Sequence, residues 1–226
     1  DHHPPRPESH LATIADVGGR YGATSTLVTE YLQSAGLKVS PEIATALFYG
    51  IKADTRDLGR QTTPVDVEAY LWLFPMVDKE ALAEIEHPKL PIEYFQLYHT
   101  AIEKAQVYDG AVICDLGEIY APDMVAEVAE RFLFLEDMKW SLAFAEFEEQ
   151  LWYSLRTSDR RMNAGRLIRE VIETRGGSAG GHGSMAGARV PMRELNRDDR
   201  ADMKREIMNA FLKAFGVKVR KPKKIV

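Results

Sequence analysis

The stretch from Gly176 to Val190 constrains this chain more than any other, because six of its fifteen residues are glycine and one histidine, His182, lies among them. Glycine lacks a Cβ atom, so its backbone can take positive φ values and approach a ligand closely. A series of exposed backbone N–H groups can form a concave site for an anion. A histidine can donate a hydrogen bond to a phosphate or stack on a base. The stretch therefore predicts either a phosphate-binding loop or a flexible loop that binds nothing.

Length and composition limit the class of protein. With 226 residues, of which 45% are hydrophobic and 28% charged, the chain can bury one sizeable core or two small ones. The net charge of −5 argues against a generally basic nucleic-acid-binding protein, so a polyanion would need a local basic patch or metal ions. The single cysteine, Cys114, allows no internal disulfide and favours a reducing cytoplasm. The longest apolar run, residues 69–77, is too short to cross a bilayer, so we expect no membrane association.

Local patterns predict helices in the first third of the chain. Residues 4–20 indicate a loop with a short strand around Leu11 to Ile14. The side chains of Thr24, Ser25 and Thr26 are expected to do no more than cap the first helix. Ser40-Pro41 and Thr63-Pro64-Val65-Asp66 are further helix starts, the second with a pattern close to a capping box.

A charged segment that ends in two prolines, residues 78–91, marks the expected domain boundary. We predict three regions: 1–80, a linker region with a helix at 81–106, and 107–226. The linker helix is expected to repeat apolar residues and His99 along one face. In the last region, Asp109-Gly110 predicts a hairpin turn, and Arg156 is expected at the end of a strand.

Three segments together resemble one known family. The opening Asp1-His2-His3 is similar to the motif that names the DHH superfamily of phosphoesterases. The segment Gly180-Gly181-His182-x-x-x-Ala186-Gly187 resembles the GGHxxAAG signature of the DHH-associated domain, although Met185 stands where that family usually has alanine. The segment Gly50 to Arg56 resembles the fourth superfamily motif, a helix that delivers an Asp-Thr pair to the metal centre. The resemblance covers nearly the whole chain.

The resemblance implies an α/β fold, with the remainder of a parallel-sheet DHH domain, a linker helix and a smaller mixed-sheet DHH-associated domain. It implies that His2 and Asp54 bind metal, that His3 contacts the transferred phosphate, and that Asp1 orients the histidines. It further implies a substrate-binding group in the last region, consisting of Arg156, Gly180, Gly181 and His182.

The implied activity is metal-dependent hydrolysis of phosphate esters in nucleotides or short oligonucleotides. The family uses two divalent ions, typically Mn²⁺ and alternatively Mg²⁺, to activate a water molecule. A non-catalytic nucleotide- or RNA-binding module and an exopolyphosphatase are the alternatives, and a homodimer stays open. In the family, an Asp-x-Asp motif and a further Asp precede the DHH triplet. Neither precedes Asp1, so we expect a piece of a longer protein that hydrolyses substrate poorly by itself.

Overall fold

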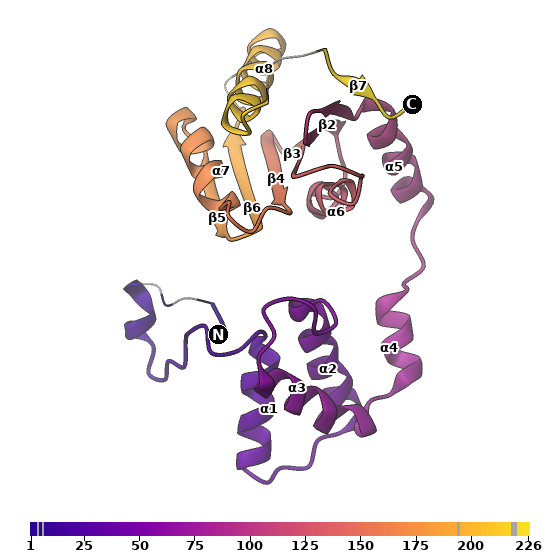
Figure 1. Ribbon diagram of the computed structural model, residues 1–226, viewed down its shortest axis with the longest axis vertical. Coiled ribbons are helices and arrows are strands. Elements are labelled where there is room, and N and C mark those ends of the chain that lie inside the picture. The colour runs from indigo at the N-terminus through magenta and orange to yellow at the C-terminus, as the bar shows by residue number, and fades with distance from the viewer. Residues whose placement is uncertain (4, 6, 194, 218–220) are drawn as a thin grey trace. The chain divides into compact units, whose positions relative to one another are not determined.

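The computed structural model of the protein describes residues 1–3, 5, 7–193, 195–217 and 221–226. It divides into two compact units, Asp1–Lys89 and Leu90–Val226, which are described separately. Figure 1 labels their helices and strands. The finer limits expected from the sequence, 1–80, 81–106 and 107–226, stay a prediction.

The first unit consists of helices and connecting segments, and its described residues contain no strand. Its helices are η1 (Pro7–Leu11), α1 (Thr24–Ser34), α2 (Pro41–Thr55), α3 (Pro64–Leu73), η2 (Phe74–Met76) and α4 (Lys79–Glu86), where η denotes a 3-10 helix. The short strand expected around Leu11 to Ile14 is wrong. Leu11 and Ile14 are 75% and 86% exposed, and no described strand lies beside them to pair with.

The helix starts of the first unit follow the local chemistry of the sequence. Ser40 caps α2 by accepting a hydrogen bond from the backbone of Ile43, and Thr63 forms a complete capping box with Asp66 at the start of α3. The helices enclose a small core of their own, formed by Ala23, Ala44, Phe48, Ile51, Ala69, Leu73 and Val77.

The second unit is built on a seven-stranded sheet with the strand order β5-β6-β4-β3-β2-β1-β7. The strands are β1 (Gln106–Tyr108), β2 (Ala111–Glu118), β3 (Trp140–Phe147), β4 (Gln150–Thr157), β5 (Ser178–His182), β6 (Met185–Pro191) and β7 (Lys223–Lys224). Strands β2 and β3 run parallel, whereas the other described pairs are antiparallel, so the sheet is mixed. The predicted hairpin turn at Asp109-Gly110 joins β1 to β2.

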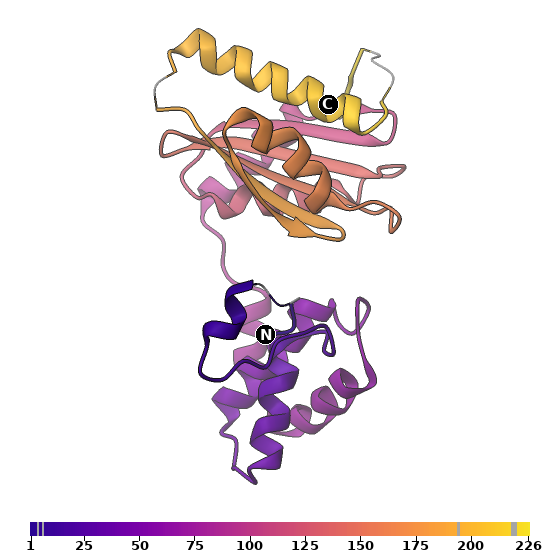
Figure 2. The same ribbon diagram turned by 90° about the vertical axis from the view of Figure 1, so that its left-hand side faces the viewer.

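Helices cover the sheet from both sides, as Figures 1 and 2 show. One face carries α5 (Ile92–Lys104) and α6 (Asp123–Phe132), which share a buried cluster with Val112 and Cys114. The other face carries α7 (Ala164–Ile172), the short η3 (Glu173–Arg175) and α8 (Arg197–Ala214), and its buried cluster includes Ile113 and Leu155. The expected linker helix therefore exists as α5, but it packs on the sheet through Leu97 and Ala101.

These elements confirm the expected α/β class with a mixed sheet in the second half. The glycine-rich stretch, expected as a loop, forms the hairpin of β5 and β6, in which Gly180 pairs with Gly187 and Gly181 with Ala186. Its backbone N–H groups are thus partly used in strand pairing. None of the helices among the described residues combines the length and the apolar character needed to cross a bilayer.

Candidate functional site

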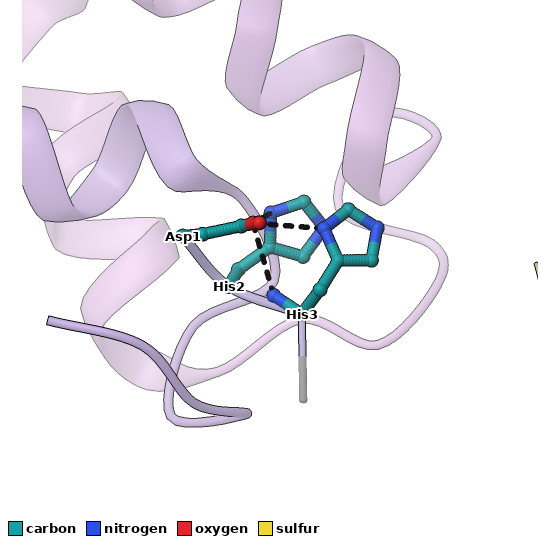
Figure 3. Close-up of side chains that lie close together, drawn as sticks. All are labelled: Asp1, His2 and His3. Carbon is teal, nitrogen blue, oxygen red and sulfur yellow. Dashed lines mark hydrogen bonds and ion pairs between the residues drawn. The ribbon is translucent and has the colours of Figure 1, made fainter. Parts of the chain in front are cut away.

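Three consecutive side chains form a compact polar cluster at the start of the first unit. One ligand atom from each of Asp1, His2 and His3 lies within 4.8 Å of the other two. His3 Nδ1 lies 2.8 Å from Asp1 Oδ1, and the His3 backbone N–H donates to the same oxygen at 3.1 Å. Figure 3 shows the two imidazole rings side by side, with their centroids 4.1 Å apart. The carboxylate of Asp1 therefore orients the His3 ring by accepting a hydrogen bond from Nδ1 of that ring.

Thr24 holds the second histidine. Its Oγ1 lies 2.8 Å from His2 Nδ1, accepts from the His2 backbone N–H at 3.2 Å, and donates to Asp1 Oδ1 at 3.3 Å. When Thr24 gives its hydroxyl proton to Asp1, it accepts from Nδ1–H of His2, and the ring lone pair then lies on Nε2.

The three hydroxyl residues at the start of α1 do not have the expected role. The N-cap of α1 is Ala23, without a side-chain hydrogen bond. Thr24 binds His2 and Asp1 instead, and Thr26 donates to Asp66 at 2.5 Å. Ser25 packs against α2, where a Cβ atom on Gly50 would lie 2.1 Å from its Oγ. Simple capping is therefore wrong for these residues, because distant partners take up their side chains.

Asp54, near the end of α2, lies beside the same cluster. Its Oδ2 is 4.0 Å from His2 Nδ1, and 44% of its side chain is exposed, against 18% for His2. The structure therefore brings together four side chains from two segments that lie about 50 residues apart: Asp1, His2, His3 and Asp54.

A buried carboxylate, Asp66, fixes the backbone that leads into α1. It accepts hydrogen bonds from the backbone of Gly22, from the hydroxyl of Thr26, and from both the backbone and the hydroxyl of Thr63. Burial alone would raise the pKa of Asp66, but the hydrogen bonds from Thr26, Thr63 and Gly22 outweigh it and hold the pKa below its ordinary value. The sequence showed Asp66 only as a capping residue, because its partners Gly22 and Thr26 lie 44 and 40 residues away.

The donor set of this cluster fits a divalent cation. Imidazole nitrogens and carboxylate oxygens are suitable ligands for ions such as Mn²⁺. The hydrogen bonds from Nδ1 of His2 and His3 leave their Nε2 atoms as the ligating atoms, and a carboxylate or hydroxyl behind a ligating histidine is the usual way to fix its orientation. His2 and Asp54 are the side chains that could hold the ion, while Asp1 contacts the His3 ring and Thr24 the His2 ring.

In the second unit, Arg156 of β4 forms an ion pair with Glu130 of α6. Its Nε donates to Glu130 Oε2 at 3.0 Å, and its Nη1 donates to Ser154 Oγ at 2.8 Å and to the Leu155 carbonyl at 3.1 Å. Its side chain is 14% exposed. Arg156 is thus held in one orientation by α6 rather than extended into solvent.

The glycine-rich hairpin lies beside Arg156. Arg156 pairs with Met185, and Ser154 pairs with Gly187, which in turn pairs with Gly180. Gly180 and Gly187 are exposed, and a Cβ atom on Gly180 would meet nothing within 4 Å. The backbone of His182 ends β5, but its side chain lies outside what the structure describes. The expected substrate-binding residues Arg156, Gly180 and Gly181 therefore belong to β4 and β5, which both pair with β6.

Comparison with known proteins gives matches over most of the chain. Residues 109–214 match the model of the DHHA1 domain. An uncharacterized protein of Methanocaldococcus jannaschii is 31% identical over 182 residues, which make up 80% of this chain and 37% of that protein. The chain thus spans well under half the length of this curated relative.

Solved structures share the fold at low identity. The crystal structure of an exopolyphosphatase-related protein from Bacteroides fragilis is 17% identical, with a TM-score of 0.73, and the match covers 95% of this chain and 64% of that chain. A pGpG-specific phosphodiesterase from Vibrio cholerae is 14% identical, with a TM-score of 0.40 over 88% of this chain and 77% of its own. The first of these two matches shows that the arrangement of helices and strands is a known one.

Proposed function

Because this chain carries a DHHA1 domain and is a DHH-associated domain protein, we propose that it belongs to a metal-dependent phosphoesterase that acts on nucleotides or short oligonucleotides. The observation that carries the proposal is the cluster of Asp1, His2 and His3 beside Asp54. Two carboxylates and two oriented imidazoles on one small surface match the ligand chemistry of a divalent ion.

Each residue of the first unit has a part that follows from its contacts. His2 and Asp54 would hold the metal, with His2 turned by Thr24 so that Nε2 is the ligand. Asp1 accepts from His3 Nδ1 and so directs His3 Nε2 outward, where it can contact the transferred phosphate. A divalent ion bound there would activate a water molecule and neutralise charge on the phosphoryl oxygens. Mn²⁺ is the first candidate and Mg²⁺ the second.

The second unit carries the proposed substrate-binding group. The Arg156 guanidinium is oriented by Glu130 and Ser154, so a phosphate that contacts it meets a donor that is already in place. The exposed backbone at Gly180 and Gly187 has no Cβ atoms, which allows a sugar or phosphate to approach the strand closely. His182 is proposed to donate to a phosphate from the end of the same hairpin.

Metal binding is the first test. We expect residues 1–226 to bind Mn²⁺ in calorimetry, and we expect Asp54→Asn and His2→Gln each to weaken binding by about 10-fold or more. Asp57→Asn is the matched control, because this neighbouring carboxylate pairs with Lys52 at 3.1 Å and belongs to a different contact. Equal Mn²⁺ affinity in all four proteins would refute the metal site.

Hydrolysis is the second test, made with the gene product that contains these residues and Mn²⁺. We expect a dinucleotide to be cleaved, and we expect His182→Ala to lower kcat/KM by roughly 10- to 100-fold, since one charge-assisted hydrogen bond is worth about 1.5–3 kcal/mol. Normal circular dichroism with normal turnover in His182→Ala would show that the hairpin has no part in substrate binding.

Polyphosphate hydrolysis and nucleotide or RNA binding without catalysis are the two alternative functions. The Bacteroides fragilis protein of similar fold is exopolyphosphatase-related, so inorganic polyphosphate is the competing substrate. Faster turnover of polyphosphate than of a dinucleotide would favour this alternative. A nucleotide- or RNA-binding module without catalysis would bind the dinucleotide in Mn²⁺ but leave it intact.

A further inference from the structure

A cavity of about 790 Å³ lies within the second unit, between α8 and the sheet. Strands β1, β2 and β3 form its floor through Gln106, Asp115, Phe144 and Glu146. The first half of α8 forms its roof, and Figure 2 shows this helix running along its face of the sheet. Its volume is in the range of pockets that hold small ligands.

This cavity is separate from the proposed substrate site. Arg156 pairs with Ser141 near the beginning of β3, whereas Glu146 is close to the other end of that strand. Five residues of strand span about 16 Å. The faces differ too, because Arg156 contacts Glu130 of α6 while the cavity lies beneath α8.

A partly buried ionic cluster forms one wall of the cavity. Lys204 Nζ lies 2.6 Å from Glu146 Oε1 and 3.3 Å from Asp115 Oδ2, and Arg200 Nη1 lies 3.3 Å from Glu146 Oε2. The Lys204 side chain is 16% exposed. The pairs neutralise much of one another's charge, yet their outer oxygens and N–H groups remain able to bind a ligand that has both donors and acceptors.

Two further arginines give the mouth of the cavity a positive charge. Arg197 and Arg205 are exposed residues that line it. Arg205 pairs with Asp202 on the helix surface at 2.7 Å, and such surface pairs are worth little, so a phosphate can replace the carboxylate at small cost. With four basic and two acidic lining residues, the lining is net positive although the whole chain is net negative.

The remaining lining residues are largely apolar. Met208 offers a thioether, Leu195 and Ala201 complete this side, and the ring of Phe144, which is 3% exposed, lies beneath them in the core. A planar base packs well against such groups. One cavity thus combines a basic mouth, an apolar wall, and carboxylates that can accept hydrogen bonds from hydroxyl or amino groups.

We propose that this cavity is a second, non-catalytic binding site for a mononucleotide. The phosphate lies at Arg197 and Arg205, the base packs on Met208 and Leu195, and the sugar hydroxyls or base amino group donate to Glu146 and Asp115. The site is separate from the residues of the proposed phosphoesterase site.

Methionine methyl NMR separates the two sites. Met208 lines the cavity, whereas Met185 belongs to β6 of the glycine-rich hairpin. The chain of 226 residues contains eight methionines, and Met208→Leu and Met185→Leu assign the two signals. Titration with AMP without metal should shift the Met208 signal in a saturable way. Inorganic phosphate and adenosine, used alone, should each bind more weakly than AMP.

The charge variants decide the outcome. Arg197→Ala with Arg205→Ala should weaken the AMP response of Met208 by about 10-fold or more, whereas Lys213→Ala, an exposed residue later on α8, should leave it unchanged. A Met208 signal that ignores AMP, or an AMP response that the double variant leaves unchanged, would refute the site. Equal affinities for phosphate and AMP would refute the nucleotide assignment. A response of Met185 alone would refute this site while supporting the hairpin site.

Discussion

Asp66 is the single residue on which the start of α1 most depends. It is fully buried and accepts hydrogen bonds from Gly22, Thr26 and Thr63, which come from two separate segments. Because these bonds are made to a charged acceptor, Asp66→Asn should lower the free energy of unfolding by about 2 kcal/mol at pH 7. Glu68→Gln, an exposed change on the same helix, should cost less than about 0.5 kcal/mol.

The pH dependence of that difference has a definite sign. The pKa of Asp66 is lower in the folded protein than its ordinary value, so its stabilisation is fully present above the unfolded pKa of about 3.9. It is lost as the pH falls through the folded pKa. Urea unfolding at pH 7, 5 and 4 should therefore show nearly the same gap between the wild type and Asp66→Asn, and the gap should narrow below pH 4. A gap that widened in acid would contradict this account.

Thr24 offers a test of how the two histidines are held. Thr24→Val keeps the shape of the side chain but removes the oxygen that contacts His2 and Asp1. Losing an orienting partner of a metal ligand typically costs 10- to 100-fold in affinity, so we expect Mn²⁺ binding to weaken by about 10-fold. Thr24→Ser keeps the hydroxyl and should restore most of the affinity. Weakening by both variants to the same degree would indicate a packing role instead.

At the scale of elements, the glycine-rich hairpin offers a matched pair of substitutions. Gly181 has φ of 132°, and a Cβ atom there would lie 2.5 Å from Ala186 Cα, so Gly181→Ala should cost at least about 1–3 kcal/mol in unfolding free energy. Gly180→Ala meets nothing within 4 Å and should unfold like the wild type. Its methyl group would, however, lie on the proposed substrate surface and weaken dinucleotide binding. Urea unfolding and calorimetry measure the two effects, and equal stability of both variants would refute the argument.

The elements that were predicted correctly are those whose causes are local. The starts of α2 and α3 depend on Ser40 and Thr63, each bonded to a backbone group three residues ahead. The DHHA1 domain could also be recognised from a short motif. The predictions that were wrong concern residues whose partners were not expected from the local sequence. Thr26 binds Asp66, 40 residues away, instead of capping α1, and the two halves of the glycine-rich stretch pair with each other as a hairpin. The site could be predicted as a set of residues, but Thr24 and Asp66 could not be assigned to it, because their contacts arise only when the helices pack.

At the scale of the whole molecule, positive charge gathers in the sequence at the C-terminal residues 218–224, whereas several cations elsewhere in the described residues are paired with acidic residues. The chain has 29 lysines and arginines against 34 acidic residues. Several lysines and arginines among the described residues form ion pairs with glutamates: Lys52 with Glu86, Arg156 with Glu130, and Lys204 with Glu146. A long nucleic acid gains affinity from many phosphate contacts in a row. Outside the C-terminal run, this charge distribution therefore favours short ligands.

Salt dependence tests this difference directly. For single strands, the slope of log affinity against log salt is about −0.7 for each phosphate contacted. A ligand held mainly by Arg156 and His182 makes about two such contacts, so we expect a slope between zero and about −2, measured by fluorescence anisotropy from 50 to 300 mM salt. A 20-nucleotide single-stranded RNA should show the same shallow slope as a dinucleotide when Lys221, Lys223 and Lys224 of the basic C-terminal run are replaced by alanine, because the extra phosphates then lose the cations that this run offers. Arg156→Ala should flatten the slope by about 0.7, whereas Arg161→Ala, an exposed arginine paired with Asp159 at 2.9 Å, should not change it. A slope steeper than about −5 for the long RNA would instead support an RNA-binding module, because seven or more phosphates would then be in contact.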